Sequence, residues 1–153
     1  MIQLVDNIRK TRIFVLDLIK ELSLEKLNKI PHGFNNNIFW NAGHLIAAQQ
    51  TILYLRAGHS LSISEDFFNN FKPGSRPERF FQSDEEDEMK QLLFGSLDIL
   101  ENDLQKNLFE TFTPWVTRTG INIENIREAL IYLHHHEGLH TGIIYSMKRM
   151  VQK

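Results

Sequence analysis

The sequence of 153 residues contains no cysteine. This absence excludes disulfide bonds, a cysteine nucleophile and a thiolate metal site. A cysteine-free chain suits a reducing compartment, so we expect a cytoplasmic protein. No run of apolar residues approaches the ~18 that a membrane span needs, and we therefore expect no membrane helix. Charges interrupt the N-terminal stretch MIQLVDNIRKTRIFVLDLIKEL every few positions, which is not the pattern of a signal peptide.

A large net charge is also missing, since 17 Lys and Arg residues stand against 19 Asp and Glu residues. Domains that bind nucleic acid usually carry a basic surface, so the composition gives no support for a nucleic-acid partner. Hydrophobic residues make up 42% and charged residues 24% of the chain, a balance typical of a folded protein with its own core. We expect one domain covering residues 1–153.

Four long segments carry apolar residues at helical spacing. We predict helices over residues 2–22, 38–57 and 123–150, and a further helix that opens at Ser83 and extends at least to Leu104. Asparagines precede the second helix as candidate N-caps. Ser83 and Glu86 match a capping box. With no series of strands, this pattern indicates an all-α protein, a four-helix bundle with a long crossover between the second and third helices.

The connections carry weaker signals. The crossover, residues 59–82, contains the turn-forming stretch KPGSRPE, and its SEDFFNNF stretch predicts one or two helical turns capped by Ser64. Residues 111–120 are β-branched and aromatic but isolated, so we expect an extended loop. The phenylalanines at 67, 68 and 71 are expected to cover the helices rather than to take part in a site. We predict an inward face of the second helix formed by Trp40, His44, Ala47, Ala48, Thr51 and Leu55.

The stretch LHHHEGLHTG holds four of the seven histidines. A helix turns about 100° per residue, so His136 and His140 lie about 40° apart on one face, within the apolar stripe of the last helix. The H-x-x-x-H spacing lets two imidazoles converge on one metal ion. His134 and His135 point elsewhere on the same helix and are expected at the rim or surface.

A third ligand would have to come from another helix, because catalytic zinc typically has three protein ligands and water. His44 is the best candidate, since it lies on the inward face of the second helix, and His32 and His59 in predicted loops are weaker ones. The spacing leaves two interpretations open. The histidines either bind a metal ion or are core residues with other hydrogen-bond partners.

The stretches FNNNIFWNAGHLIAAQQ and HEGLHTGII resemble the DinB-like family, which includes metal-dependent enzymes. Members of the family are four-helix bundles in which three histidines hold a divalent metal ion. The resemblance implies that His44, His136 and His140 are the metal ligands. It covers essentially the whole chain in the order and length of its helices. One departure is Ile143, where many relatives carry glutamine, so the tuning of the site would differ here.

The family contains several chemistries, and a fold does not determine a reaction. The resemblance implies an enzyme that acts on a small molecule, either by transfer of a low-molecular-weight thiol or by metal-assisted hydrolysis. The alternative is a non-catalytic binding or stress-associated bundle whose metal is structural or absent. Nickel, zinc, manganese and iron all suit nitrogen ligands. Bundles of this kind often pair through an apolar helix face, which makes a homodimer an option.

Helix geometry also places two neighbours of the histidines. Glu137 lies about 100° around the helix from His136, so we expect it at the rim or beside a ligand rather than acting as a general base. Asn41 precedes His44 by three residues and shares its face, where it could orient a ligand or a substrate. Its alternative role is to cap the start of the helix. Trp40 is expected to form wall or core.

Overall fold

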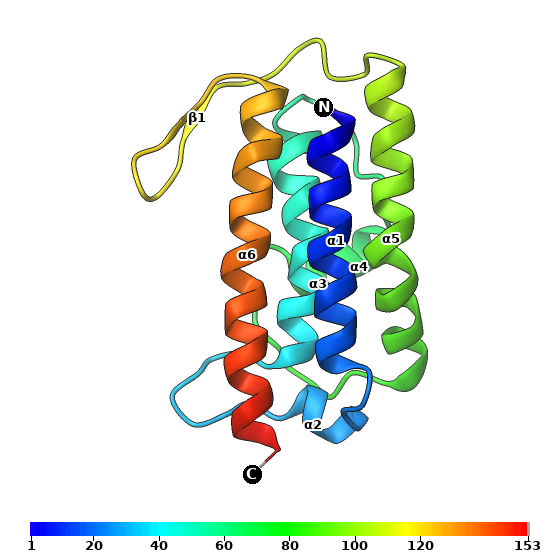
Figure 1. Ribbon diagram of the computed structural model, residues 1–153, viewed down its shortest axis with the longest axis vertical. Coiled ribbons are helices and arrows are strands. Elements are labelled where there is room, and N and C mark those ends of the chain that lie inside the picture. The colour runs from blue at the N-terminus through cyan, green and yellow to red at the C-terminus, as the bar shows by residue number, and fades with distance from the viewer. Residues whose placement is uncertain (153) are drawn as a thin grey trace.

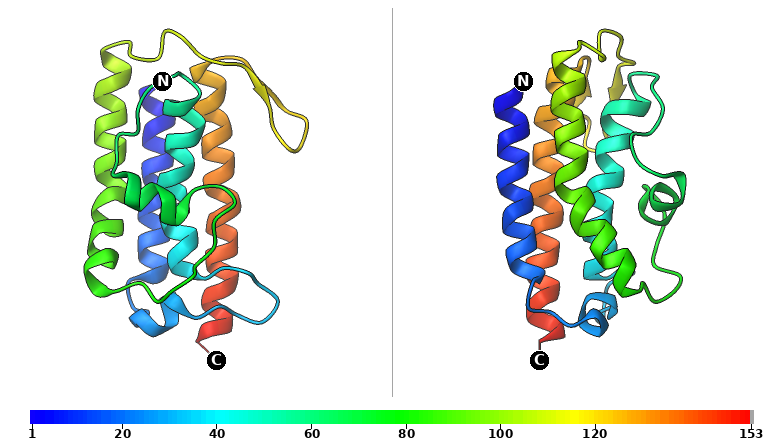
Figure 2. Two further views of the ribbon diagram at one scale, coloured as in Figure 1. Left: turned by 180° about the vertical axis from the view of Figure 1, so that it is seen from behind. Right: turned by 90° about the vertical axis from the view of Figure 1, so that its right-hand side faces the viewer.

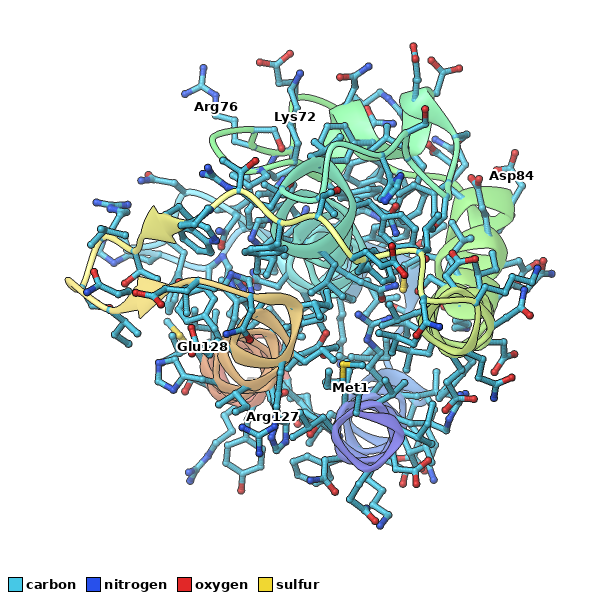
Figure 3. All side chains as sticks on the ribbon, turned by 90° about the horizontal axis from the view of Figure 1, so that it is seen from above. Met1, Lys72, Arg76, Asp84, Arg127 and Glu128 are labelled. Atoms are coloured by element: carbon cyan, nitrogen blue, oxygen red, sulfur yellow. The ribbon has the colours of Figure 1, made fainter. Side chains whose placement is uncertain are left out.

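Four long helical segments lie side by side along one axis in the computed structural model of the chain, which describes residues 1–152 (Figure 1). They are α1 (Ile2–Ile19), α3 (Ile38–Gln49) with its continuation η1 (Gln50–Leu55), α5 (Ser83–Gln105) and α6 (Ile126–Val151). Both α1 and α3 contact α5 and α6. Seen end-on, the helices surround a common interior, with charged side chains such as Lys72, Arg76 and Asp84 at the edge (Figure 3). The predicted all-α class is confirmed.

The crossover between the second and third long helices is a consequence of their direction. Because α3 and α5 run the same way, the chain must return along the outside of α3 before α5 begins (Figure 2). This return carries the short helix α4 (Glu65–Phe71), and the Ser64 hydroxyl caps it by accepting from the Phe67 N–H at 3.2 Å. A second short helix, α2 (Leu24–Asn28), follows α1. The predicted crossover and its Ser64 cap are both present.

Several predicted helix ends are wrong by a few residues. The first helix ends at Ile19 rather than at residue 22, and the last begins at Ile126, where the Asn125 side chain accepts from the Glu128 N–H at 3.0 Å. The capping box at the start of α5 is displaced by one residue. Its N-cap is Gln82 rather than Ser83, and the Glu85 carboxylate accepts from the Gln82 N–H at 2.9 Å.

The second long helix changes its winding part-way along. The regular α-helix ends at Gln49, and the next six residues form a π-helix, η1. The wider turn rotates the side chains that follow it, as π-helical segments do. The predicted inward position of Leu55 is therefore wrong, because this side chain is 44% exposed, whereas Gln50 is buried. The Gln50 Oε1 accepts from the Ser62 N–H at 2.8 Å and so ties the crossover to this segment.

A small hairpin precedes the last helix, where an extended loop was expected. Strand β1 (Trp115–Val116) pairs antiparallel with β2 (Asn122–Ile123), and Figure 1 shows the hairpin projecting beside the start of α6. The turn ends at Gly120, whose φ of +82° favours glycine. The pairing brings Trp115 opposite Ile123, which is buried. The expectation of a loop was wrong because two-residue strands give no periodic signal in the sequence.

Two apolar clusters fill the interior. One packs the second half of α1 against α3 and the end of α6, and the other packs the start of α1 against η1, the end of α5 and the start of α6. Between them lie four buried polar residues, Arg12, Gln49, Ser96 and Glu137, which we call the arginine layer. In the described part of the chain, no helix has the length and hydropathy of a membrane span.

Candidate metal centre

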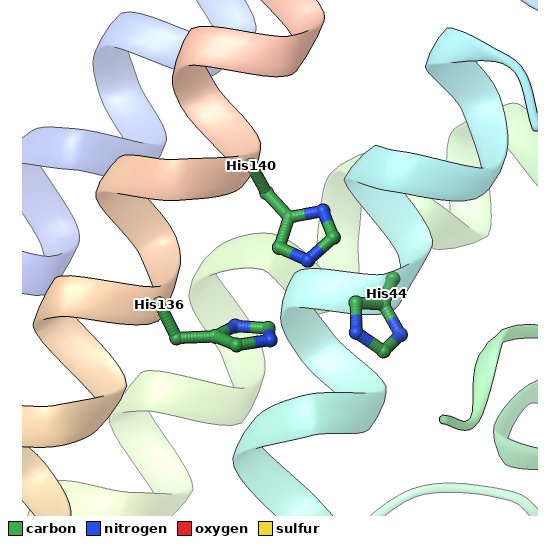
Figure 4. Close-up of side chains that lie close together, drawn as sticks. All are labelled: His44, His136 and His140. Atoms are coloured by element: carbon green, nitrogen blue, oxygen red, sulfur yellow. The ribbon is translucent and has the colours of Figure 1, made fainter. Parts of the chain in front are cut away.

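The three histidines predicted as ligands come together on facing helices. His136 and His140 lie one turn apart on α6, and His44 faces them from α3 (Figure 4). The ring centroids are 4.6 Å apart between His136 and His140, 4.7 Å between His44 and His140, and 5.3 Å between His44 and His136. One nitrogen from each ring lies within 4.8 Å of the others. We call these three residues the histidine cluster.

Two of the rings are held in a fixed orientation by hydrogen bonds. The His44 Nδ1 donates to the backbone carbonyl of Phe71 at 2.7 Å, and the His140 Nδ1 donates to the Asn41 Oδ1 at 2.8 Å. The Asn41 oxygen must be the acceptor, because its Nδ2 already donates to the Asn37 carbonyl at 2.7 Å. A histidine whose Nδ1 donates a hydrogen bond keeps the lone pair of Nε2 free for a metal ion. Asn41 was expected to orient a ligand or a substrate, and its side chain does contact the His140 ring.

The Phe71 carbonyl reaches His44 because α4 packs closely on α3. A Cβ atom added at Gly43 would lie 2.6 Å from the Phe71 ring, so a larger residue would push α4 away. Phe71 itself is buried in the core, as expected of a covering residue. Its backbone oxygen nevertheless belongs to the site, which residue type could not reveal. On the other side, the Trp40 ring stacks on His44 with centroids 4.6 Å apart and planes at 12°.

His136 differs from the other two members of the cluster. Its Nδ1 is buried and has no hydrogen-bond partner among residues 1–152. A buried imidazole nitrogen without a partner is costly, so such atoms call for an explanation. A bound ion or water near the ring would supply one. Together with the two rings fixed through Nδ1–H, this ring completes a set of three nitrogen donors that could hold a cation.

Burial favours the neutral form of all three imidazoles. Burial lowers the pKa of His44, although the Phe71 carbonyl opposes this shift. Burial and the neighbouring His44 lower the pKa of His136 to about 4 and that of His140 to about 3. A neutral imidazole is the form that ligates a metal ion. The cluster therefore presents lone pairs rather than positive charge.

The histidine cluster lines one side of a cavity of about 530 Å³. This volume lies within the range of small-molecule sites. Aromatic side chains form much of the remaining wall, and two arginines also face the cavity. The lining outside the cluster consists of Trp40, Ala48, Thr51, Ile52, Arg56, Pro73, Gly74, Trp115, Arg118, Tyr132 and Leu139. The predicted placement of Trp40 as wall agrees with this lining.

Glu137 does not lie at the rim. It is fully buried, and its Oε1 accepts from the Arg12 Nη2 at 2.7 Å and from the Arg12 Nε at 3.1 Å. The rim expectation was wrong because α6 is covered on two sides: His136 faces α3 and its neighbour faces α1. Burial raises the pKa of the Glu137 carboxyl, and the Arg12 guanidinium opposes that shift. A carboxylate sealed in this way is not available to act on a molecule in the cavity.

Arg12 was not identified from the sequence. It uses all five of its N–H donors: two on Glu137, one each on the Leu93 carbonyl, the Ser96 hydroxyl and the Leu45 carbonyl. One side chain thus joins α1 to the three other long helices. The signal was present, because Arg12 falls in the same stripe as Ile8, Val15 and Ile19, where a charge needs a buried partner.

The remaining candidate histidines lie apart from the cluster. His135 is exposed, and His134 is half-buried with its Nε2 3.4 Å from the Thr11 hydroxyl. His32 is exposed in a loop. The His59 Nε2 is 2.7 Å from the Leu108 carbonyl. His134 and His135 therefore lie at the rim and surface, as expected. The two loop histidines, His32 and His59, do not join the histidine cluster.

Comparison with protein families identifies the chain. Residues 8–144 match the DinB superfamily, which is most of the sequence and includes all three histidines of the cluster. The chain belongs to the DinB superfamily. No curated protein matches the sequence. The predicted family is therefore confirmed, and the histidine cluster of this DinB protein could hold a metal ion.

Proposed function

We propose that this DinB protein is a metal-dependent enzyme in which His44, His136 and His140 bind one divalent ion beside the cavity. In this proposal the four long helices form a single domain of the four-helix-bundle type. The observation that carries it is the set of three neutral imidazoles, two with Nδ1 fixed by acceptors, that line a cavity of about 530 Å³. Nickel, zinc, manganese and iron all suit such nitrogen donors.

An ion bound there would supply a Lewis acid toward an oxygen atom or would favour the thiolate form of a thiol. The residues of the chain hold and screen the reactants. The Phe71 carbonyl and Asn41 keep two imidazoles in the ligating tautomer, and Trp40 stacks on His44. The aromatic walls of the cavity would exclude bulk water from a bound molecule.

Of the two reaction classes, we favour thiol transfer to an electrophile. Metal-assisted hydrolysis commonly uses a carboxylate beside the ion as general base, as in the H-E-x-x-H proteases. Here the glutamate of that sequence, Glu137, is held in the core by Arg12, and no Asp or Glu is among the residues lining the cavity. Since the chain has no cysteine, the thiol would have to be a small-molecule cosubstrate.

The experiment is a pair of turnover assays on metal-loaded protein made without a histidine tag. Consumption of a low-molecular-weight thiol with an electrophile such as 1-chloro-2,4-dinitrobenzene would support transfer, and thiol-independent cleavage of 4-nitrophenyl acetate would support hydrolysis instead. Activity should disappear with a chelator and in His140→Ala. His135→Ala is the matched control on the same helix and should retain it. Turnover that survives in His44→Ala would contradict the proposal.

A further inference from the structure

The cavity next to the histidine cluster has a marked charge pattern. Its lining contains two arginines, Arg56 at the end of η1 and Arg118 in the hairpin turn, and no acidic residue. Among the six other arginines of the chain, three have carboxylate partners in the structure: Arg9 with Asp98, Arg12 with Glu137 and Arg79 with Glu85. In the described part of the chain, neither cavity arginine is within 4.0 Å of a carboxylate.

The hairpin carries Arg118 and contacts Arg56 at the end of η1. The backbone carbonyl of Arg56 accepts from the Thr113 N–H at 2.8 Å, which ties the start of the hairpin segment to the end of η1. The Arg56 guanidinium lies over the Trp115 ring, 4.9 Å from its centroid. Stacking on an aromatic face fixes a guanidinium without using its N–H donors. Arg56 is thus held in place with its hydrogen-bonding capacity free.

A further polar group in the wall lacks a partner. The Trp115 Nε1 is buried and makes no hydrogen bond within residues 1–152. The Trp115 ring also packs edge-on against Tyr132, with centroids 5.3 Å apart, so the indole is fixed in the wall of the cavity. The cavity lining therefore includes an indole N–H and two guanidinium groups, a set of donors with no carboxylate acceptor among the lining residues.

We propose that this cavity binds a small organic anion, with Arg56 and Arg118 holding its carboxylate or phosphate group. This assignment rests on the proposed function and names the class of its substrate. The planar guanidinium groups match the geometry of both anions. The walls of Trp40, Trp115 and Tyr132 would contact an apolar or flat part of the same molecule, and the histidine cluster would face its reactive part.

The test uses metal-free protein, so that an anion cannot bind through the metal ion. Benzoate, phenyl phosphate and the neutral benzamide are titrated at pH 7.5 against tryptophan fluorescence. The chain has two tryptophans and both line the cavity, so a bound ring should change the signal. We expect benzoate or phenyl phosphate to bind at least about tenfold more tightly than benzamide, as charge-assisted hydrogen bonds would give. The anion that binds more tightly shows whether the cavity recognises a carboxylate or a phosphate group.

Substitutions then assign the anion to its residues. Arg56→Gln and Arg118→Gln should each weaken binding of the preferred anion by about tenfold or more and leave benzamide unchanged. Arg56→Lys should retain part of the binding. Arg127→Gln, an exposed position at the start of α6 outside the cavity, is the control and should bind as the wild type does. Circular dichroism checks that each variant is folded.

Equal binding of the anions and benzamide would overturn the proposal, as would anion binding that is unaffected in both glutamine variants. Metal content, measured on the same preparations, separates the two proposals. A protein that binds one metal ion but does not discriminate anions would contradict the anion site alone. A protein that discriminates anions but takes up no metal would contradict the metal enzyme and leave an anion-binding cavity.

Discussion

His136 and Glu137 are neighbours in the sequence, yet they belong to two buried polar regions with opposite properties. In the arginine layer, Arg12 has a partner for every donor, and Gln49 and Ser96 bond to each other at 3.1 Å and through the Ser96 carbonyl at 2.9 Å. The layer keeps one unpartnered atom, because the second oxygen of Glu137, Oε2, makes no hydrogen bond within residues 1–152. In the histidine cluster, His44 and His140 each make one hydrogen bond through Nδ1, and the His136 Nδ1 makes none. A guanidinium with every donor satisfied stabilises one packing, whereas imidazole lone pairs without donors are free for a ligand.

The largest expected effect comes from breaking the arginine layer. Arg12→Leu leaves the Glu137 carboxyl buried without its cation, and we expect the free energy of unfolding to fall by about 3–5 kcal/mol. Urea denaturation followed by circular dichroism measures it. Arg9→Leu is the matched control on α1, because Arg9 pairs with Asp98 and Glu101 at the surface, where such pairs contribute about 0–1 kcal/mol. Similar losses of stability in the two variants would contradict the distinction between the buried Arg12 pair and the surface Arg9 pairs.

The histidine cluster should lower the stability of the protein in acid. Below pH 6.5 the unfolded chain gains protons on these histidines, whereas the folded chain does not until the pH nears the lowered pKa values of about 4 and 3. The stability of the metal-free protein should therefore fall as the pH drops below 6.5 and be unaffected by these groups above it. His140→Gln should reduce the slope by up to about 1.4 kcal/mol per pH unit.

The control for this slope is His135→Gln, which changes an exposed histidine of the same helix. Urea denaturation at several values between pH 5 and pH 8, with a chelator present, gives the slopes. A slope for His140→Gln equal to that of the wild type would show that this imidazole gains its proton as readily in the folded protein as in the unfolded chain.

The orientation of His140 can be tested through Asn41. Asn41→Ala removes the acceptor of the His140 Nδ1–H, and the loss of such a supporting partner should weaken metal binding by roughly 10–100-fold. Asn36→Ala is the control, since the Asn36 Oδ1 accepts from the Asn41 Nδ2 at 3.1 Å and does not contact the oxygen that holds His140. Competition with a chromophoric chelator measures both affinities. Unchanged affinity in Asn41→Ala would mean that His140 does not need its partner.

Two glycines should differ in the sign of their effect on stability. Gly43→Ala would clash with the Phe71 ring, and we expect a loss of about 1–3 kcal/mol together with weaker metal binding, because the Phe71 carbonyl would move from His44. Gly138→Ala, on α6 with nothing within 4 Å of the added Cβ, should instead stabilise the helix by about 0.5–1 kcal/mol. Thermal and urea unfolding measure both. A tolerated Gly43→Ala would contradict the close packing of α4 on α3.

Helical periodicity predicted the long helices and the convergence of the histidines, because a 3.6-residue repeat fixes which side chains share a face. It could not place Glu137, since one helix wheel does not show how many neighbours cover the helix. The π-helical turn of η1, which exposes the Leu55 side chain, likewise has no signal in the helical periodicity. The Phe71 carbonyl and the hairpin that brings Arg118 to the cavity depend on tertiary packing, which periodicity does not describe.

Calorimetric titration of the untagged, metal-free protein with zinc tests the central claim most directly. We predict one tight site in the wild type, no tight site in His136→Ala, and an unchanged site in His135→Ala, which removes an adjacent histidine of the same helix. Equal zinc binding by the two variants, or no tight site in the wild type with zinc, nickel or manganese, would contradict the assignment. The histidine cluster would then be a polar part of the core and not a metal centre.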